Sequence, residues 1–196
     1  MARKKTITRD QILTAAYEVV ANDGFSKFTA RNIANQMKCS TQPIYLEFAN
    51  MDDLKQEVVK VIFKHLSEDI FTREVTTNRL IDFGLNYIDF ATKEKKLYRA
   101  LYLEDSGNGS MMQETSFRWF KKIAIEHSDY ANLSDEQIQS IYIGFWIVAT
   151  GMASLMSAGI LEFVQEDVIK ALEETLAIVL EREEIIDIKV KTSKSK

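Results

Sequence analysis

Apolar residues recur every three to four positions along most of the chain, which is the spacing of amphipathic helices. In the first fifty residues this spacing predicts a helix after Thr8 that ends at Gly24, a second after Thr29 and a third after Ser40. Thr and Ser accept hydrogen bonds from the N–H groups of a helix start, and Gly supplies the left-handed residue of a helix exit. Residues 38–40 alone separate the second and third helices, so the chain must turn sharply there.

The third predicted helix contains the only proline of the chain, Pro43. With Ser40 as N-cap, Pro43 stands at the third helical position, where the N–H groups have no intrahelical partner, so proline stiffens the helix without breaking it. Ile44 and Phe48 share one face and anchor the helix. A short, stiff helix with an exposed polar start is what the major groove of DNA admits. The exposed polar residues here are Thr41, Gln42 and Tyr45.

From residue 51 onward the predicted helices are longer. The apolar spacing predicts helices over residues 51–71, 77–92, 94–104, 111–128, 134–160 and 165–184, and "DSGNGS" (105–110) predicts a loop. Ser134 and Gln137 form a capping-box pattern at the start of one of them. With one Pro and seven Gly, chain breakers are scarce, so the predicted fold class is all-α. The stripe of the first long helix contains Leu54, Val58, Val61, Ile62, Leu66 and Ile70.

Residues 137–161 contain no charged side chain and are long enough to span a bilayer. Small and hydroxylated residues dilute this segment, its flanks are acidic, and no cluster of basic residues stands beside it to orient a span. A helix buried in a core or in a subunit interface explains the segment better than a membrane span. A small membrane-anchored protein is the alternative that this segment keeps open.

Charge is distributed unevenly along the chain. Residues 1–50 hold seven basic and four acidic residues, a net charge of +3, so the remainder carries −7 in a chain of −4. A basic head on an acidic body indicates that the head meets a polyanion. One cysteine, Cys39, excludes an internal disulfide, and the basic start "MARKKTITRD" has no apolar segment after it. Both features favour a cytoplasmic protein.

An ordered set of motifs runs from about residue 7 to residue 54. It comprises Gly-Phe after the first helix, T-x-R-x-I-A in the second, I-Y-x-x-F in the third and D-D-L at the fourth. Together these motifs resemble the DNA-binding domain of the tetracycline-repressor (TetR) family of bacterial regulators. Residues 145–155, "FWIVATGMASL", are similar to the W-x-x-x-H-G-x-x-x-L segment of one large TetR subgroup, with Thr150 in place of the usual His.

The resemblance implies a protein of about nine helices with a helix-turn-helix DNA-binding domain over residues 1–50. An effector-binding and dimerisation domain is expected over 51–186, followed by a basic, frayed tail over 187–196. The implied function is a ligand-responsive regulator, a repressor that binds a near-palindromic double-stranded operator as a homodimer and is released by an apolar or aromatic small molecule. No enzyme activity, cofactor, metal or membrane is expected. The alternative is a helical small-molecule or lipid-binding protein, or an enzyme, that uses the aromatic cavity.

The DNA-contacting residues are expected in the head. Gln42 can form paired hydrogen bonds with adenine, Tyr45 can donate to phosphate, and Glu47 can accept from a cytosine amine. Polar residues that merely decorate a helix surface are the alternative. Lys38 stands where the family often has Gly, which implies a left-handed lysine near DNA. The complete predicted set is Lys5, Arg9, Thr29, Arg31, Lys38, Ser40, Thr41, Gln42, Pro43, Tyr45 and Glu47.

The body is rich in aromatic residues, some of which are expected to line the effector cavity, with Tyr hydroxyls giving polar contacts. The pocket set is His65, Phe83, Tyr87, Tyr98, Tyr102, Phe117, Phe120, Tyr142 and Trp146. The resemblance also implies that the last two helices pair with a second subunit in a four-helix interface. The dimer set is Ile147, Gly151, Ser154, Leu155, Leu172, Leu176 and Val179.

Overall fold

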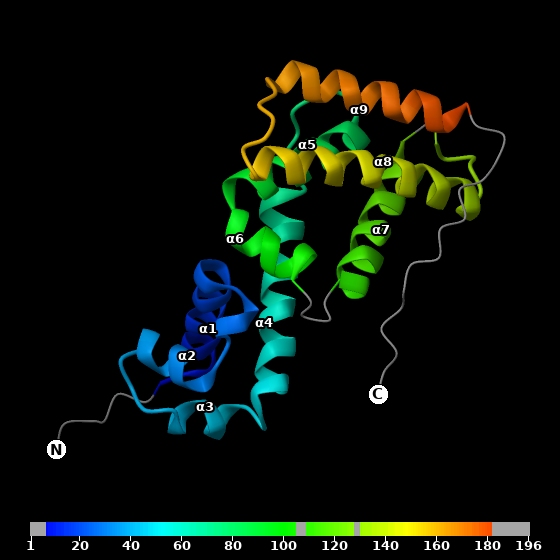
Figure 1. The fold of residues 1–196 in the computed structure, drawn as a ribbon. Helices are drawn as coiled ribbons and strands as arrows, with labels where there is room; N and C mark the ends of the chain where they lie inside the picture. Colours follow the sequence, from blue (N-terminus) through cyan, green and yellow to red (C-terminus); the bar gives the residue numbers. More distant parts are fainter. Residues whose placement is uncertain (1–6, 105–108, 128–129, 182–196) are drawn as a thin grey trace.

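The computed structural model describes residues 7–104, 109–127 and 130–181, which form nine α-helices and no β-strand (Figure 1). The all-α prediction is therefore confirmed. Lys5 and the predicted tail over 187–196 lie outside the described residues. The helices are α1 Arg9–Asp23, α2 Ala30–Gln36, α3 Gln42–Glu47, α4 Met51–His65, α5 Arg79–Lys93, α6 Lys95–Tyr98, α7 Gly109–Glu126, α8 Asp135–Ser157 and α9 Gln165–Leu180.

The helices form a head and a larger body that α4 connects (Figure 1). Helices α1, α2 and α3 gather around the lower half of α4, and α3 lies at the lower end of the molecule. Helices α8 and α9 cross the opposite, upper end. A 3₁₀ turn, Phe25–Lys27, follows α1, and π-helical turns, Leu66–Ile70 and Arg99–Leu103, extend α4 and α6. The surface expected to read DNA therefore lies far from the pair α8 and α9.

The predicted caps at three helix starts are confirmed. The Thr8 hydroxyl accepts from the Gln11 N–H at 3.3 Å while the Gln11 side-chain oxygen accepts from the Thr8 N–H at 3.0 Å. Ser134 and Gln137 form the same reciprocal pair at α8. Thr29 Oγ1 accepts from the Asn32 N–H at 3.2 Å at α2. These contacts join residues three apart, which is why the sequence alone reveals them.

Some local predictions were wrong. Gly24 has the expected positive φ of 77°, but its ψ of 176° is extended rather than left-handed helical. Residues 109–110, predicted as loop, begin α7. Val61 is exposed instead of lying in the buried stripe of α4, because the core lies on the side of Leu54 and Val58.

Helix α5 is the centre of the body, because every residue from Leu80 to Ile88 is buried against α7, α8 and α9. Gly84 makes this close packing possible. A Cβ atom at Gly84 would lie 2.6 Å from Phe145 Cζ and 2.9 Å from Leu172 Cδ1, inside van der Waals contact. The absence of a side chain thus lets α8 and α9 approach the same point of α5.

Helix α8 is the segment that suggested a membrane span. It is long and apolar enough to cross a bilayer, and 39% of its most apolar window is buried inside the protein. The buried face, which includes Ile141, Phe145 and Ala149, packs on α5 and α9. The opposite face presents Ile147 and Leu155 to the surface.

The turn between α2 and α3 depends on a left-handed lysine. Lys38 has φ 54°, and it is the only positive-φ residue other than glycine in the described part of the chain. The Lys38 N–H donates to Asn35 O and the Cys39 N–H donates to Ala34 O, each at 3.0 Å. This pair of hydrogen bonds is the Schellman arrangement, in which glycine is the preferred residue at the left-handed position.

We predict that Lys38→Gly raises the free energy of unfolding by about 1 kcal/mol, because glycine adopts this conformation without the steric cost of a Cβ atom. Lys38→Ala is the matched control, since it removes the same charge and keeps the strain. Urea denaturation of the three proteins measures the difference. Equal stability of the Gly and Ala variants would contradict a strained turn.

Candidate DNA-binding surface and effector site

Helix α3 begins one residue later than predicted. Thr41 is the N-cap, without a side-chain capping bond, so Pro43 is the second helical residue and Ser40 lies in the turn. This register corrects the prediction that Ser40 caps the helix. The physical role of Pro43 is unchanged, because the second position also lacks an intrahelical N–H partner. The Thr41 hydroxyl is not used as a cap.

The anchoring face of α3 is buried and its other face is open. Ile44 and Phe48 are almost inaccessible to solvent, and they hold the helix on the core of the head. Tyr45 is 55% exposed and Leu46 is 76% exposed. The structure therefore brings Gln42, Tyr45 and Glu47 together on an open helix surface, as the spacing predicted.

Leu46 is a surface residue that sequence reasoning missed. Three quarters of the area of the Leu46 side chain lies in water, so it contributes little to the core of the head. An apolar side chain beside Gln42 and Tyr45 is suited to contact the methyl group of thymine. Its place two residues after the anchor Ile44, off the buried face, was the signal in the sequence.

The start of α2 is the second part of this surface. Thr29 and Arg31 are both exposed. The Thr29 oxygen already accepts the capping bond, which leaves the hydroxyl hydrogen free to donate to phosphate. The positive end of the helix dipole favours an anion at this place.

Arg9 holds helix α3 in place rather than reaching outward. Its Nη1 donates to the Glu47 carbonyl oxygen at 3.0 Å, and the guanidinium lies 4.2 Å from the centre of the Phe48 ring. Its Nη2 also pairs with the Glu57 carboxylate of α4 at 3.5 Å. Hydrogen bonding from Lys60, with Arg9, holds the pKa of Glu57 below its ordinary value. Arg9 thus connects the end of α3 to α4.

The aromatic residues of the body form a connected cluster. Tyr98 stacks on Tyr102 with ring centres 5.3 Å apart, and the rings of Tyr87 and Tyr102 are perpendicular with centres 5.2 Å apart. The Tyr87 hydroxyl lies 3.3 Å from the Tyr98 hydroxyl and 3.2 Å from Thr150 Oγ1. Thr150, which replaces the histidine usual in the TetR subgroup, therefore joins this tyrosine network. The rings of Phe117 and Phe120 pack against Tyr142 at 5.3 and 5.4 Å.

Burial keeps the tyrosine hydroxyls neutral. Loss of solvent raises the pKa of Tyr87 far above its ordinary value, and the neighbouring Tyr102 and Tyr98 add to the effect. Burial likewise raises the pKa values of Tyr102 and Tyr142. The cluster can therefore offer hydrogen bonds but no phenolate charge to a ligand.

The cluster encloses little empty space. A cavity lies between Phe83, Tyr87, Tyr142 and Trp146. Its volume of about 10 Å³ has room for at most one water molecule. Among the described residues, Trp146 Nε1 is buried without a hydrogen-bond partner. An unpaired buried donor costs about 1–3 kcal/mol.

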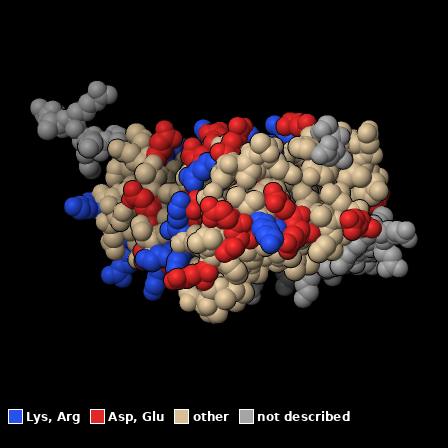
Figure 2. Space-filling view, turned by 90° about the horizontal axis from the view of Figure 1, so that it is seen from above, with Lys and Arg blue, Asp and Glu red and all other residues tan. Residues whose placement is uncertain are grey.

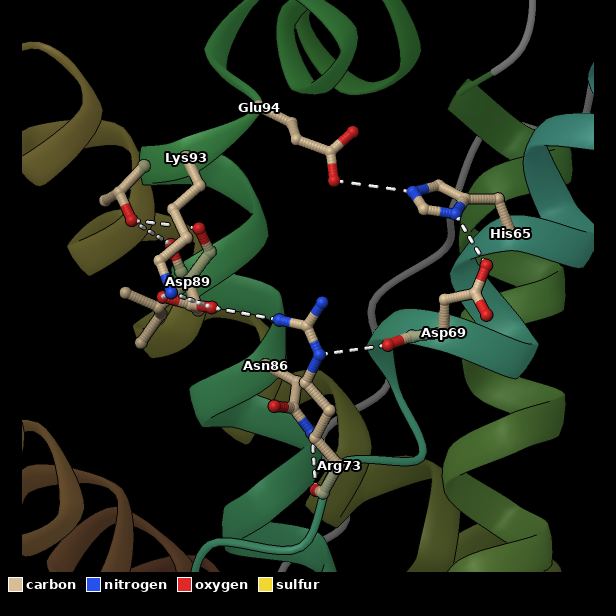
Figure 3. A network of polar contacts seen from close by, with 9 residues as sticks. His65, Asp69, Arg73, Asn86, Asp89, Lys93 and Glu94 are labelled. Atoms are coloured by element: carbon tan, nitrogen blue, oxygen red, sulfur yellow. Dashed lines mark hydrogen bonds and ion pairs between the residues drawn. The ribbon is translucent and has the colours of Figure 1, made fainter.

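His65 stands apart from this cluster. Its Nδ1 lies 2.9 Å from Asp69 and its Nε2 lies 3.4 Å from Glu94 (Figure 3). Its ring also contacts the Tyr17 ring of α1, with ring centres 6.2 Å apart. The structure thus places His65 where the head joins the body, not with the predicted pocket residues.

The predicted dimer residues divide into two groups. On α8, Ile147, Gly151 and Leu155 are exposed, while Ser154 is half-buried with its Oγ 3.5 Å from the Tyr98 hydroxyl. On α9, the side chains face the other way. Three predicted dimer residues of α9 are instead buried in the subunit's own core, where α9 packs on α5 and α8. They are Leu172, Leu176 and Val179, and the prediction that they face a second subunit is corrected.

The geometry defines a class of protein. A helix, a sharp turn and a second helix with an open polar face, joined to a larger helical body, form a helix-turn-helix DNA-binding protein. Residues 12–58 match the family described as bacterial regulatory proteins, tetR family. This match covers most of α1, all of α2 and α3, and the first half of α4.

Similar proteins agree with this match. A Haemophilus influenzae protein described as an uncharacterised HTH-type transcriptional regulator is 22% identical over 160 residues, 79% of this chain and 77% of its own. A Vibrio parahaemolyticus protein assigned to the TetR family has the same fold (TM-score 0.65, 17% identity, 86% of this chain and 96% of that chain). A TetR-like transcriptional regulator from Rhodococcus sp. RHA1 also has it (TM-score 0.61, 18% identity, 89% and 96%).

Residues 12–58 are therefore a helix-turn-helix DNA-binding domain of the TetR family, and the chain is similar over most of its length to a transcriptional regulator. The resemblance predicted from its motifs is thereby confirmed. The family and the similar proteins are regulators and not enzymes, which argues against the alternative that the chain is an enzyme using the aromatic cavity.

We predict that Arg9→Lys lowers the free energy of unfolding by about 1 kcal/mol and Arg9→Ala by about 2 kcal/mol, since Lys keeps the charge and loses the planar, forked contact. Both variants should also bind DNA several-fold more weakly, because α3 loses its hold at Glu47. Thermal melting and fluorescence anisotropy measure the two effects. Full recovery of stability and affinity with Lys would show that Arg9 acts as a point charge on phosphate.

Proposed function

We propose that this protein is a ligand-responsive repressor that binds a near-palindromic operator as a homodimer. The observation that supports it best is the presentation of α3, with two buried anchors on one face and Gln42, Tyr45 and Leu46 open on the other. Each α3 would enter one major groove. Two such helices, related by the dimer axis, would read the two halves of the operator.

Base reading would rest on a few side chains of α3. Gln42 would pair with adenine through two hydrogen bonds, and Leu46 would contact a thymine methyl group. Tyr45 and Thr41 would donate to phosphates, with Lys38, Thr29 and Arg31 adding backbone contacts. The face of the body seen from above has many Asp and Glu side chains interspersed with Lys and Arg (Figure 2).

The dimer would form through the outer faces of α8 and α9. Ile147 and Leu155 on α8, with Ile178 and Leu180 on α9, are large apolar residues exposed in the single chain. Ile160–Val164 between the helices adds further exposed apolar area. Apolar area of this extent on two adjacent helices favours a four-helix interface with a second copy.

The effector would bind in the body and act by shifting a population. Because the ring cluster is nearly closed, a ligand that enters it must separate the rings, and it would favour a conformation other than this one. An apolar or aromatic molecule with one hydrogen-bond acceptor suits the neutral hydroxyls and the unpaired Trp146 Nε1. The second candidate, a helical small-molecule or lipid-binding protein, uses the same cluster but leaves the open face of α3 without a role.

The proposed functions belong to two successive parts of the chain. Residues 1–50 would bind DNA, and residues 51–186 would bind the effector and the second subunit. A DNA-binding regulator of bacteria acts on the chromosome, which implies a cytoplasmic location.

Selection of binding sites from a random DNA pool tests the DNA-binding half. We predict recovery of a two-fold-related motif, with affinity for that motif reduced at least about tenfold in the double variant Gln42→Ala, Tyr45→Ala, since each lost contact removes about 1 kcal/mol or more. Gln56→Ala, an exposed glutamine on α4, is the matched control and should bind normally. A folded dimer that enriches no sequence would refute the proposal for the head.

Analytical ultracentrifugation tests the dimer. We predict that Ile147→Arg weakens association more than about 100-fold, because it places an unpaired charge in an apolar interface at a cost of about 3 kcal/mol. Ile125→Arg on α7 is the matched control, because Ile125 is 49% exposed and Ile147 is 52% exposed. Dissociation by both variants, or by neither, would count against an interface on α8.

A further inference from the structure

A second site lies outside the ring cluster. The cavity in the ring cluster has a volume of about 10 Å³. A half-open groove between α5 and the adjoining ends of α8 and α9 has a volume of about 370 Å³. This volume lies within the range of small-molecule sites in proteins. The groove can therefore accept a ligand without separating packed side chains.

Positive charge is in excess on the wall of the groove. Lys93 Nζ lies 2.8 Å from Asp89 Oδ1, and Arg73 Nη1 lies 3.3 Å from Asp89 Oδ2 (Figure 3). These three are the charged residues among those that line the groove. Two cations thus share one carboxylate, and a second carboxylate placed between them would complete both pairs.

A buried amide fixes one of these cations. Asn86 lines the groove and is only 3% exposed, and its Nδ2 donates to the Arg73 carbonyl oxygen at 2.8 Å. Arg73 Nε donates to the Asp69 carbonyl oxygen at 2.9 Å. Because both its backbone and its guanidinium are held, Arg73 loses little conformational freedom when it meets an anion.

The rest of the groove is apolar. Leu85 and Ile88 of α5 and Val168 of α9 are buried lining residues. Met156 at the end of α8 and Phe163 before α9 complete this side. The site therefore has a cationic end and a hydrocarbon end.

We propose that this groove binds an amphiphilic organic anion, a carboxylate attached to an alkyl or aryl body. The carboxylate lies between Arg73 and Lys93, and the apolar body covers Met156, Phe163 and Val168. A small inorganic anion lacks the apolar area, and a neutral hydrocarbon leaves the excess positive charge unused. Both therefore bind more weakly than the amphiphile.

The groove is connected to the head by a chain of polar contacts. From Asp89 the chain passes through Arg73 to Asp69, and from the Asp69 carboxylate to His65 at 2.9 Å (Figure 3). The His65 ring meets the Tyr17 ring of α1, with centres 6.2 Å apart. A carboxylate that pairs with Arg73 therefore acts on the turn that ends α4, because Arg73 Nε also donates to the Asp69 carbonyl oxygen of that turn. Control of DNA binding by this route rests on the proposed function, whereas binding to the groove does not.

Isothermal titration calorimetry of the full-length protein with submicellar decanoate tests the site. Decanoate is expected to bind once per chain, and 1-decanol at least about tenfold more weakly, since it lacks the charge-assisted contact. Lys93→Gln should weaken decanoate between about threefold and tenfold. Met156→Trp should abolish binding by filling the groove.

Lys64→Gln is the matched control. Lys64 and Lys93 are 72% and 69% exposed, and each forms an i,i+4 pair with an acidic residue, but Lys64 does not line the groove. No decanoate binding, equal affinity for decanol, or the same loss in both lysine variants would overturn the proposal. Unchanged binding in Lys93→Gln and Met156→Trp would move the ligand elsewhere and overturn it as well. The titration contains no DNA, so it tests the groove alone. Failure of the protein to bind DNA would contradict the proposed function without affecting the proposal for the groove.

Discussion

Burial of one apolar stripe on helix α4 is the interaction on which the rest of the structure depends. Leu54 and Val58 are buried where α4 meets α1, and Ile62 and Leu66 continue the stripe towards the body. Burying each such side chain contributes about 1.5–3 kcal/mol. Head and body consequently share one continuous core. Helix α4 therefore belongs to the packing of both parts, the head that carries α3 and the body.

Two further contacts bring the body onto α1. Glu94, the N-cap residue of α6, lies 3.4 Å from His65 Nε2, and the His65 ring contacts the Tyr17 ring of α1. Burial raises the pKa of Tyr17, and the carboxylates of Glu94 and Asp69 raise it further, so this junction holds a neutral phenol. At the exit of α1, a Cβ atom on Gly24 would lie 2.7 Å from a Glu104 oxygen. The Glu104 side chain can move away from such an atom, so it is the positive φ of the turn that favours glycine here.

Low sequence identity to proteins of the same fold has a physical basis here. The core needs apolar side chains of suitable volume at helical spacing, and many combinations satisfy that need. The head is more restricted, because it must combine a capped α2, a left-handed turn and two anchors within about twenty residues. The family match lies in this restricted part of the chain, residues 12–58, whereas the whole chain shares its fold with a protein of 17% identity.

What the sequence alone determined is local. The helices and the caps at Thr8, Thr29 and Ser134 depend on contacts within five residues, and the pattern of residues predicts them. The left-handed turn at Lys38 is equally local, but it was implied by the family resemblance. The open face of α3 also followed from spacing, although the exposed Leu46 was overlooked and the cap was placed one residue early.

Tertiary structure decided whatever depends on which elements meet. Arg9 holds the end of α3 across 38 residues of sequence, a contact that no local pattern contains. Leu172 and Leu176 have the spacing of an interface helix, but an amphipathic stripe does not say whether its partner is the same chain or a second one. Periodicity likewise made His65 a pocket residue, and it could not size the ring cavity or reveal the groove beside Arg73. Spaces and long-range contacts arise from the angles at which helices pack, and the sequence specifies those angles only through the whole set of side chains at once.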